Sequence, residues 1–509
     1  MSAVLDPANW VDQAARDHPR RLFLKTPAGR NLDYLALHAE SGRFASALRR
    51  RGVVPGDRVA VRVDKSAEAV LLYVACLRMG AVFVPINVAN TPNEVEYLLR
   101  DSQPRLAIIR PADRALLEPL AARAGTAHVD SLGVNGEGSL IELAAQSEES
   151  LRPLQSGDTN SLAAIVYTSG TTGRSKGAML TRANLASNAA ALVQAWRFTS
   201  GDVLLHTLPL FHVHGLFAAI NTVLASASSL LLLSKFDAAE ALTHLSEVTV
   251  FMGVPTHYTR LLAQAGLNRE ATARVRLFVS GSAPLSAETH HEFLRRTGHV
   301  ILERYGMTET LMNTSNPYDG MRVPGSVGEP LPGVTIRVAG GAHDAGGSAA
   351  DVVGMLEITG PNVFAGYWGD ADKTRAEFTA DGWFKTGDLG RIDANGYVHI
   401  VGRVKDLVIS GGYNVYPKEV ETELDALAGV LESAVFGVPH PDFGEGVTAA
   451  VVPRPGAVLS EAEVINALQQ RLARYKVPKR VLLLDELPRN AMGKVQKIVL
   501  RAAYATLYQ

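Results

Sequence analysis

The 509-residue chain has a single cysteine, no long apolar run and no surplus of either charge. Cys76 has no partner for an internal disulfide, and its apolar helical surroundings favour a buried structural thiol over a nucleophile. Aliphatic runs such as 230–233 fall far short of a membrane span, and residues 1–10 lack the basic and apolar parts of a secretory signal. We therefore expect a cytoplasmic protein that spans no membrane.

The charge balance excludes further classes of partner. Lys and Arg total 50 and Asp and Glu total 51, which gives a formal net charge of -1. No global basic surplus is present to hold nucleic acid or an anionic membrane, although a pocket for a small anion needs only a few charges. A hydrophobic share of 47% indicates a globular protein, and the length indicates more than one domain.

Most of the chain alternates strand-like and helical segments, which predicts helix-flanked, mostly parallel sheets. We expect a large N-terminal domain over 1–402, with a β-rich subdomain from about 325 where short strands and turns dominate. A small α+β domain is expected over 407–509. The clearest segments are strands at 58–63, 81–86, 106–109, 203–205, 230–233, 248–255, 275–279 and 300–306, and helices at 35–51, 67–78, 94–100, 417–427 and 460–472.

A glycine-rich stretch, 167–177 (YTSGTTGRSKG), follows the strand-like run 162–166. Segment 178–185 after it is typical of a helix start. Glycines allow backbone N–H groups to converge on an anion, hydroxyls add donors, and Lys176 adds a mobile cation. The spacing differs from that of a Walker loop, and on its own the stretch leaves two interpretations open, a phosphate-binding loop and a flexible surface loop.

Five motifs occur in order along the chain, and together they resemble the adenylate-forming superfamily of acyl-CoA synthetases, luciferases and peptide-synthetase adenylation domains. They are the glycine-rich stretch, 305–310 (YGMTET), 386–388 (TGD), 402–406 (GRVKD) and 488–494 (PRNAMGK). The resemblance spans essentially the whole chain. It departs at Ser175, where the family usually has proline, a residue that only stiffens the turn.

The resemblance implies an enzyme that joins a carboxylic acid to coenzyme A in two steps, with ATP and coenzyme A as substrates and Mg²⁺ as cofactor. The acid first attacks ATP to give an acyl-adenylate and pyrophosphate, and coenzyme A then displaces AMP. The residues implied to bind ATP and AMP are Thr168, Ser169, Gly170, Thr171, Thr172, Gly173, Lys176, Ser282, Ala283, Pro284, Glu303, Arg304, Tyr305, Gly306, Met307, Thr308, Asp388, Arg403 and Lys494.

The same resemblance assigns catalytic roles to Lys494, Glu309 and Thr168. Glu309 and Thr168 would hold Mg²⁺, which prefers oxygen ligands. Lys494 would supply the cation that is needed where a carboxylate meets a triphosphate. An acetyltransferase or deacetylase acting on Lys494 is a further implied partner, since acetylation removes this charge.

Domain rotation is also implied. Lys405 occupies the family's hinge, which we place at 403–406. After adenylation the small domain would turn about it, withdraw Lys494, and bring a loop toward the coenzyme A tunnel. The residues of that loop are Gly411, Gly412 and Tyr413.

The segments expected to line the acyl pocket carry polar groups, namely His212, His214, Arg260 and Ser280, which argues against a fatty acid. A buried arginine needs an anion, and an acid with a second carboxylate would supply one. Met307 would narrow the pocket. Run 307–315 and the Arg260 segment are similar to malonyl-CoA synthetases, which implies malonate as substrate, with methylmalonate also possible.

Three alternatives stay open. The first is a ligase of the same fold for another small or aromatic acid. The second is an adenylation module that passes its acyl group to a carrier protein. The third is a catalytically dead scaffold, which would be expected to have lost Glu309, Asp388 or Lys494, yet all three are present.

Overall fold

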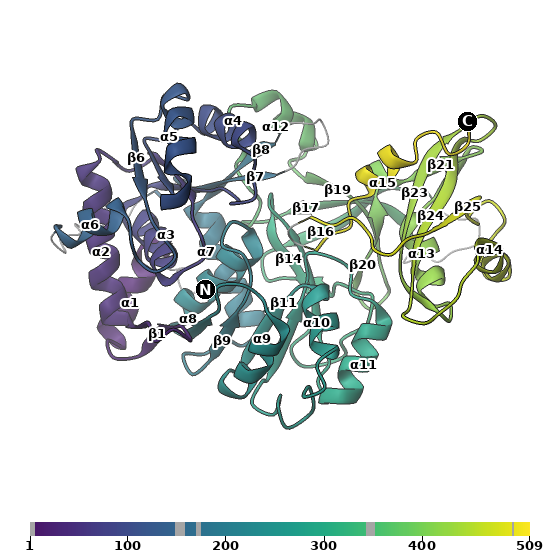
Figure 1. Cartoon of the computed structure of the whole chain (residues 1–509), viewed down its shortest axis with the longest axis horizontal. Helices are drawn as coiled ribbons and strands as arrows, with labels where there is room; N and C mark the ends of the chain where they lie inside the picture. The colour runs from purple at the N-terminus through teal and green to yellow at the C-terminus, as the bar shows by residue number, and fades with distance from the viewer. Residues whose placement is uncertain (1–5, 148–157, 169–174, 343–351, 491–492) are drawn as a thin grey trace.

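The computed structural model describes residues 6–147, 158–168, 175–342, 352–490 and 493–509. Figure 1 shows a broad α/β body and, at one side, a smaller unit that holds the C-terminus. The predicted fold class is confirmed: a large N-terminal part of mostly parallel sheets, a β-rich subdomain and a small α+β C-terminal part. None of the helices in the described ranges is both long and apolar enough to cross a bilayer.

The first large sheet has seven strands in the order β18-β8-β7-β4-β3-β5-β6. Its centre is parallel, as the alternating pattern predicts. The helices on its side of the body are α2 (Tyr34–Arg50), α3 (Ala67–Met79), α4 (Pro92–Ser102), α5 (Arg114–Arg123), α6 (Ser139–Ala145) and α12 (Ala371–Glu377). The strands are β3 (Arg58–Arg62), β4 (Val82–Pro85), β5 (Leu106–Ile109), β6 (His128–Ser131), β7 (Leu162–Thr168), β8 (Lys176–Thr181) and β18 (Gly366–Tyr367).

The segment after the glycine-rich stretch corrects one prediction. Residues 178–185 do not begin a helix, because β8 runs to Thr181 and pairs antiparallel with β7, with Thr168 opposite Lys176. Ala178 and Leu180 are buried in this hairpin. The side chain of Thr181 then caps α7, which begins at Arg182.

The second large sheet has nine strands in the order β15-β14-β13-β12-β11-β9-β10-β1-β2, and its central strands are parallel. Its strands are β1 (Leu22–Lys25), β2 (Asn31–Asp33), β9 (Val203–His206), β10 (Ser229–Leu232), β11 (Val250–Gly253), β12 (Leu277–Ser280), β13 (Leu302–Met307), β14 (Leu311–Ser315) and β15 (Glu329–Pro330). Its helices are α1 (Trp10–Asp17), α7 (Arg182–Ala195), α8 (Asn221–Ser226), α9 (Ala238–His244), α10 (Pro255–Leu262) and α11 (Ala287–Thr297). One continuous apolar core joins it to the first sheet.

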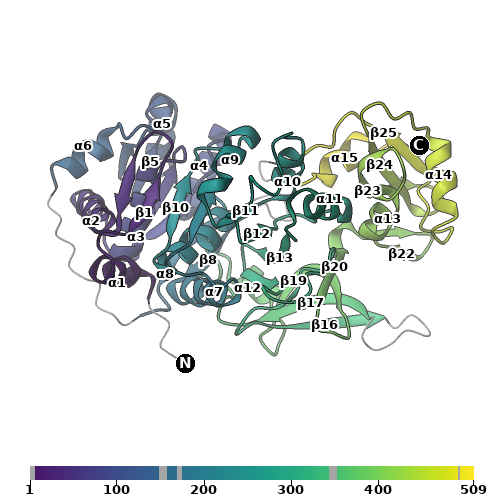
Figure 2. The same ribbon diagram turned by 90° about the horizontal axis from the view of Figure 1, so that it is seen from below.

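The remaining strands form two smaller sheets. The β-rich subdomain is an antiparallel sheet of β16 (Thr335–Ala342), β17 (Val353–Thr359), β19 (Phe384–Ile392) and β20 (Val398–Arg403), which lies below the two large sheets in Figure 2. A 3₁₀ turn, Val404–Asp406, follows it at the predicted hinge. The C-terminal unit contains β21 (Val408–Ser410), β22 (Tyr413–Val415), β23 (Val430–His440), β24 (Gly444–Pro453), β25 (Arg480–Leu483), α13 (Pro417–Asp425), α14 (Glu461–Gln469) and α15 (Lys497–Ala503).

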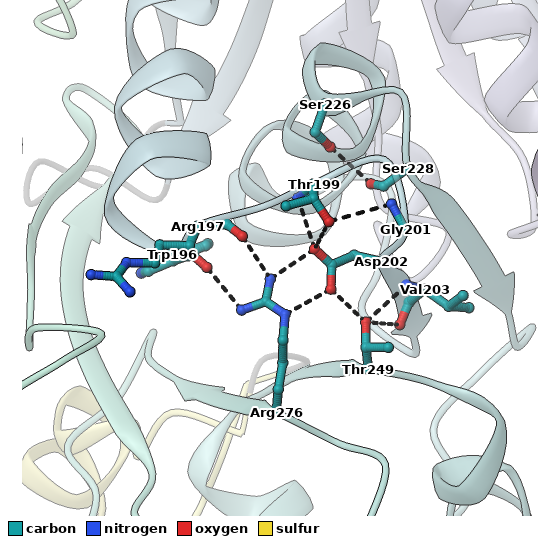
Figure 3. A network of polar contacts seen from close by, with 10 residues as sticks. All are labelled: Trp196, Arg197, Thr199, Gly201, Asp202, Val203, Ser226, Ser228, Thr249 and Arg276. Carbon is teal, nitrogen blue, oxygen red and sulfur yellow. Dashed lines mark hydrogen bonds and ion pairs between the residues drawn. The ribbon is translucent and has the colours of Figure 1, made fainter. Parts of the chain in front are cut away.

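A buried ion pair fastens the amino ends of three parallel strands (Figure 3). The carboxylate of Asp202, 4% exposed, accepts hydrogen bonds from Arg276 Nε at 2.7 Å and Nη2 at 2.8 Å. Thr249 Oγ1 donates to the same carboxylate at 2.7 Å, and Arg276 Nη1 donates to the Trp196 carbonyl at 3.0 Å. The pair therefore ties β9 to β11, β12 and the end of α7, at the edge opposite the site described below.

Asp202→Ala is expected to lower the free energy of unfolding by about 3–5 kcal/mol, because it leaves the Arg276 guanidinium without its anion. Loss of structure in urea, followed by circular dichroism, measures the effect. Asp372→Ala removes an acidic partner whose side chain is 91% exposed and should leave the midpoint unchanged. Equal shifts for both variants would show that the buried network adds nothing.

Candidate functional site

The candidate site lies at the carboxyl ends of β12 and β13. The turn after β12 contains Ser282, a non-glycine residue with φ of 71°, a strained conformation that is common at functional sites. A Cβ at Gly281 would come within 2.6 Å of the Arg304 guanidinium carbon, so only glycine lets this side chain pack against the turn. The predicted nucleotide segments 282–284 and 303–308 thus adjoin each other at one edge of the sheet.

Arg304 is buried without an anionic partner. The residue is 3% exposed, and its Nε and Nη2 have no hydrogen-bond partner within the described part of the chain. Burial lowers the pKa of Arg304 to about 9, which leaves the side chain charged at neutral pH. An unpaired buried guanidinium is costly, so this position is prepared for an anion.

Other unsatisfied polar atoms occur in this part of the fold. Ser280 Oγ and His214 Nε2 are buried and likewise have no partner among the described residues. Burial and the charge of Arg304 keep the pKa of His214 well below its ordinary value, while Ser282 Oγ lies 3.3 Å from His214 Nδ1. We call Ser280, Arg304, His212 and His214 the acyl pocket. His214 opens a π-helical segment, His214–Ile220, a geometry often found at functional sites.

The predicted ribose-binding residues form one hydrogen-bonded group. Asp388 on β19 lies opposite Arg403 on β20, and Arg403 Nε is 2.7 Å from Asp388 Oδ1. The Tyr305 hydroxyl donates to Asp388 Oδ2 at 2.5 Å. Asp388 is 3% exposed, so the group is rigid and joins β13 to the β-rich subdomain. A rigid carboxylate beside an aromatic ring suits the sugar and base of a nucleotide.

The predicted phosphate end is described only in part. Ser169, Gly170, Thr171, Thr172 and Gly173 lie outside the described residues. Lys176 Nζ sits 5.6 Å from the centre of the Tyr367 ring, and the Tyr367 hydroxyl donates to Glu309 Oε1 at 3.0 Å. Lys176, Tyr367 and Glu309 therefore cluster beside the β7–β8 hairpin that ends in Thr168.

Glu309 fits the predicted Mg²⁺ site. It is 7% exposed, and burial raises its carboxyl pKa, as expected of an acid that lacks a cation. No cluster of three or more metal-binding side chains occurs within the described ranges. Mg²⁺ commonly takes one or two protein oxygens and completes its shell with substrate phosphates, so two ligands, the predicted Glu309 and Thr168, would be enough to hold it. Bound there, the ion would neutralise triphosphate charge.

Lys494 reaches this site from the C-terminal unit on a braced turn. Its backbone N–H donates to Asn490 Oδ1 at 3.0 Å, and Arg489 Nη1 donates to the Gly493 carbonyl at 2.6 Å. A Cβ at Gly493 would lie 3.0 Å from Thr256 Oγ1, so this turn touches α10 of the large domain. Desolvation, with the nearby charge of Arg403, lowers the pKa of Lys494 to about 8.

His212 links Lys494 to the acyl pocket. Burial lowers the pKa of His212 to about 4, and the charges of Arg304 and Lys494 act in the same direction. Both cations are therefore close enough to His212 to affect its titration. The structure brings together the nucleotide residues, the acyl pocket and Lys494, which were predicted from segments up to three hundred residues apart.

A cavity of about 460 Å³ opens beside this site and was missed by the sequence analysis. We call it the interdomain cavity. Segments after β3 and β4 form one wall, segments after β9 and β11 form the other, and Arg489, Asn490 and Gly493 close it from the C-terminal unit. In both large sheets the strand order reverses at one of these strands, β3 or β9. Ligands of open α/β sheets bind at such switch points.

Two sets of predicted residues lie elsewhere. Arg260 is exposed on α10 and lines the interdomain cavity, so the expectation of a buried Arg260 is wrong. It occupies the last turn of an amphipathic helix whose buried face carries His257, Tyr258 and Leu261. Gly411, Gly412 and Tyr413 are exposed in the β21–β22 turn and do not line the cavity, and Lys405 is exposed in the hinge turn.

Sequence reasoning did not consider Tyr367. It placed Arg304 with the nucleotide and His214 with the acyl pocket. A signal was available for Arg304, because two charged residues in the apolar strand pattern 300–306 must both be buried. The partners of His214 and Tyr367 come from distant segments, so their positions had no local signal.

The fold and this site define an adenylate-forming enzyme. The chain belongs to the AMP-binding enzyme family: that family matches residues 11–368, and the AMP-binding enzyme C-terminal domain matches residues 419–494. It is an AMP-forming acid–CoA ligase, and such ligases use ATP, coenzyme A and Mg²⁺.

Individual relatives point to more than one acid. Malonate–CoA ligase from Arabidopsis thaliana is 35% identical over 478 residues, covering 88% of this chain and 78% of the relative. Indoleacetate–CoA ligase from Aromatoleum aromaticum is 34% identical over 501 residues, covering 97% of both chains. The ATP-bound crystal structure of MatB from Rhodopseudomonas palustris matches with a TM-score of 0.95 and 52% identity, covering 99% of this chain and 100% of that one.

Proposed function

We propose that the protein is a malonyl-CoA synthetase. It converts malonate and MgATP to malonyl-adenylate and pyrophosphate, and then malonyl-adenylate and coenzyme A to malonyl-CoA and AMP. The observation that carries the choice of acid is the buried guanidinium of Arg304, which has unpartnered N–H groups and lies close enough to His214 to affect its titration. A dicarboxylate would fit this site, because one carboxylate pairs with Arg304 while the other reacts.

The chemistry of the acyl pocket favours malonate over the acids of other relatives. An indole or a fatty chain would leave the Arg304 charge and the Ser280 and His214 atoms buried without partners, at a cost of several kcal/mol. The malonate carboxylate can accept from Arg304 Nε and Nη2 as a bidentate pair. Methylmalonate adds a single methyl group and would be accepted more weakly. The malonate–CoA ligase among the relatives supports the same choice.

The two steps would use the two domains in turn. In the arrangement seen here, Lys494 faces the nucleotide site and its turn closes the interdomain cavity, which suits adenylation. Rotation about 403–406 would withdraw the turn and open the cavity to coenzyme A. The mouth of the cavity carries Lys65, Lys235 and Arg260, cations that suit the phosphates of coenzyme A. Acetylation of Lys494 would remove the charge that adenylation needs.

A panel of acids tests the proposal. Coenzyme A-dependent AMP release should be fastest with malonate, slower with methylmalonate, and at least about 100-fold slower with succinate, acetate, octanoate and indoleacetate. The monocarboxylates would leave the Arg304 guanidinium without an anion, and succinate separates its two carboxylates by one carbon more than malonate does. Faster turnover of acetate or indoleacetate than of malonate would reject malonate as the substrate and leave the ligase class intact.

A further inference from the structure

Helix α12 (Ala371–Glu377) lies next to the phosphate end of the site, and no step described so far uses its side chains. It follows β18, which pairs antiparallel with β8 so that Tyr367 lies opposite Ala178. The Tyr367 backbone N–H donates to Thr374 Oγ1 at 2.9 Å, which ties the helix to β18. Helix α12 is therefore held near the strand that begins at Lys176 (Figure 1).

Lys373 on α12 adds a second cation beside Lys176. Its side chain is 28% exposed and forms an ion pair with Glu377, one turn further along the helix. Partial burial lowers the pKa of Lys176, and the charge of Lys373 acts in the same direction, so the two ammonium groups lie close to each other. Two like charges at such close range repel each other until an anion joins them.

The acids near the two lysines do not balance their charge. Glu377 pairs with Lys373, in the order of lysine before glutamate that is the weaker one at this helical spacing. Asp370 is exposed to solvent, and its carboxylate accepts from the Lys373 backbone N–H at 2.9 Å as the cap of α12. Two cations beside one half-buried carboxylate leave a surplus of positive charge that an anionic ligand can neutralise.

This surplus lies beside the predicted magnesium ligands. Lys176 Nζ is 5.6 Å from the centre of the Tyr367 ring, and the hydroxyl of that ring donates to Glu309 Oε1 at 3.0 Å. Lys176 also lies opposite Thr168, the other predicted ligand, in the β7–β8 hairpin. Both lysines therefore belong to the end of the site where the β- and γ-phosphates of ATP would carry their charge.

We propose that Lys373 is a second phosphate-binding lysine, which acts with Lys176 on the β- and γ-phosphates of ATP and on the pyrophosphate formed from them. The flexible side chain of Lys373 leaves Glu377 for a phosphate oxygen when the polyanion binds. Pyrophosphate takes up negative charge as its bond to the α-phosphate breaks, so a cation at this end stabilises the leaving group. Glu377 opposes the same phosphates and favours their release.

The inference rests on the ligase class and on the placement of the triphosphate at Lys176 and Glu309, and it does not require malonate to be the acid. Isothermal titration calorimetry with MgATP and with AMP, without any acid present, tests it independently of the acid panel. AMP carries no β- or γ-phosphate. The two ligands therefore separate an effect on these phosphates from an effect on the whole nucleotide site.

Lys373→Met is expected to weaken MgATP binding about 10-fold and to leave the Kd for AMP within about twofold of wild type, as for the loss of one hydrogen bond to a charged group. The difference from wild type should shrink as salt is added, because the lost attraction is electrostatic and partly exposed. Lys373→Arg keeps the charge and should stay within about threefold of wild type.

Glu377→Gln should have the opposite effect and tighten MgATP binding about threefold. It removes the carboxylate that competes for Lys373 and repels the phosphates. An ion pair with a purely structural role predicts something different, because loss of either partner would then harm the helix in the same way. The opposite signs of the two variants therefore distinguish phosphate binding from a structural role.

Arg375→Met is the matched control, because it removes a cation of the same helix whose side chain is 72% exposed and pairs with Asp372. It should leave both dissociation constants within about twofold of wild type. Unchanged MgATP binding in Lys373→Met, equal losses for MgATP and AMP, or weaker MgATP binding in Glu377→Gln would overturn the proposal. If Lys176→Met also binds MgATP as the wild type does, the placement of the triphosphate is wrong as well.

Discussion

Lys494→Ala is expected to lower the rate of adenylate formation about 10³-fold while thioester formation from supplied malonyl-adenylate and coenzyme A continues near the wild-type rate. The first step brings a carboxylate onto a triphosphate, and the charge that gathers there needs the ammonium group. In the proposed second step the Lys494 turn leaves the cavity, so loss of the Lys494 side chain should not slow thioester formation. Pyrophosphate release and thioester formation, measured separately, check the two halves.

The pH dependence of adenylation gives a second, independent test of the role of Lys494. Its pKa of about 8 in the unliganded protein means that the charged form is lost as pH rises through this value. The kcat/KM for ATP should therefore fall above about pH 8, and in Lys494→Arg the fall should move to higher pH because guanidinium stays charged. Equal loss of both half-reactions in Lys494→Ala would reject the division of labour between the two steps.

The turn that carries Lys494 is braced within the C-terminal unit, as the proposed rotation requires. Arg489 holds the Gly493 carbonyl and also pairs with Glu432 on β23, so the turn that carries Lys494 is fixed to the C-terminal unit. Glu288 on α11 pairs with Arg454, which directly follows β24, across the domains. Arg489 and Glu432 move together in a rotation about 403–406, whereas the Glu288–Arg454 pair must break.

Much of the fold could be predicted from the sequence because local patterns carry it. The apolar runs that became β3, β4, β5 and β12 alternate with amphipathic helices, and this order alone indicates parallel sheets. The β8 strand was mistaken for a helix start because a short apolar run has no decisive periodicity. Its pairing with β7 across the glycine-rich stretch, and with β18 from nearly two hundred residues later, decided its conformation.

The sequence motifs of the site could be predicted, but not which of their side chains contact one another. Asp388, Tyr305 and Arg403 were each singled out, and the structure joins them by hydrogen bonds. Arg260 was preferred as the buried cation because its segment is similar to malonyl-CoA synthetases, yet it is exposed on the wall of the interdomain cavity, while Tyr258 and Leu261 of the same helix are buried. Arg260 lies on the exposed face of its helix, whereas Arg304 lies on the buried first half of strand β13, and this difference determines which arginine is buried.

Arg304→Leu is expected to lower kcat/KM for malonate about 10³-fold and to retain or raise adenylation of propionate. Removing one partner of a buried charge pair costs several kcal/mol, and about 4 kcal/mol corresponds to this factor. Propionate has the size of malonate without the second carboxylate, so it makes no use of the guanidinium and gains from an apolar wall. Acid-dependent pyrophosphate release, measured for both acids, gives the two constants.

Arg260→Ala serves as the matched control, because Arg260 is exposed on the wall of the interdomain cavity while Arg304 is buried. It should leave kcat/KM for malonate within a few-fold of wild type and raise at most the KM for coenzyme A. If Arg304→Leu loses propionate and malonate equally, Arg304 serves the nucleotide and not the acid. If only Arg260→Ala shows a selective loss of activity with malonate, then Arg260 on α10, and not the buried Arg304, binds the second carboxylate and determines specificity.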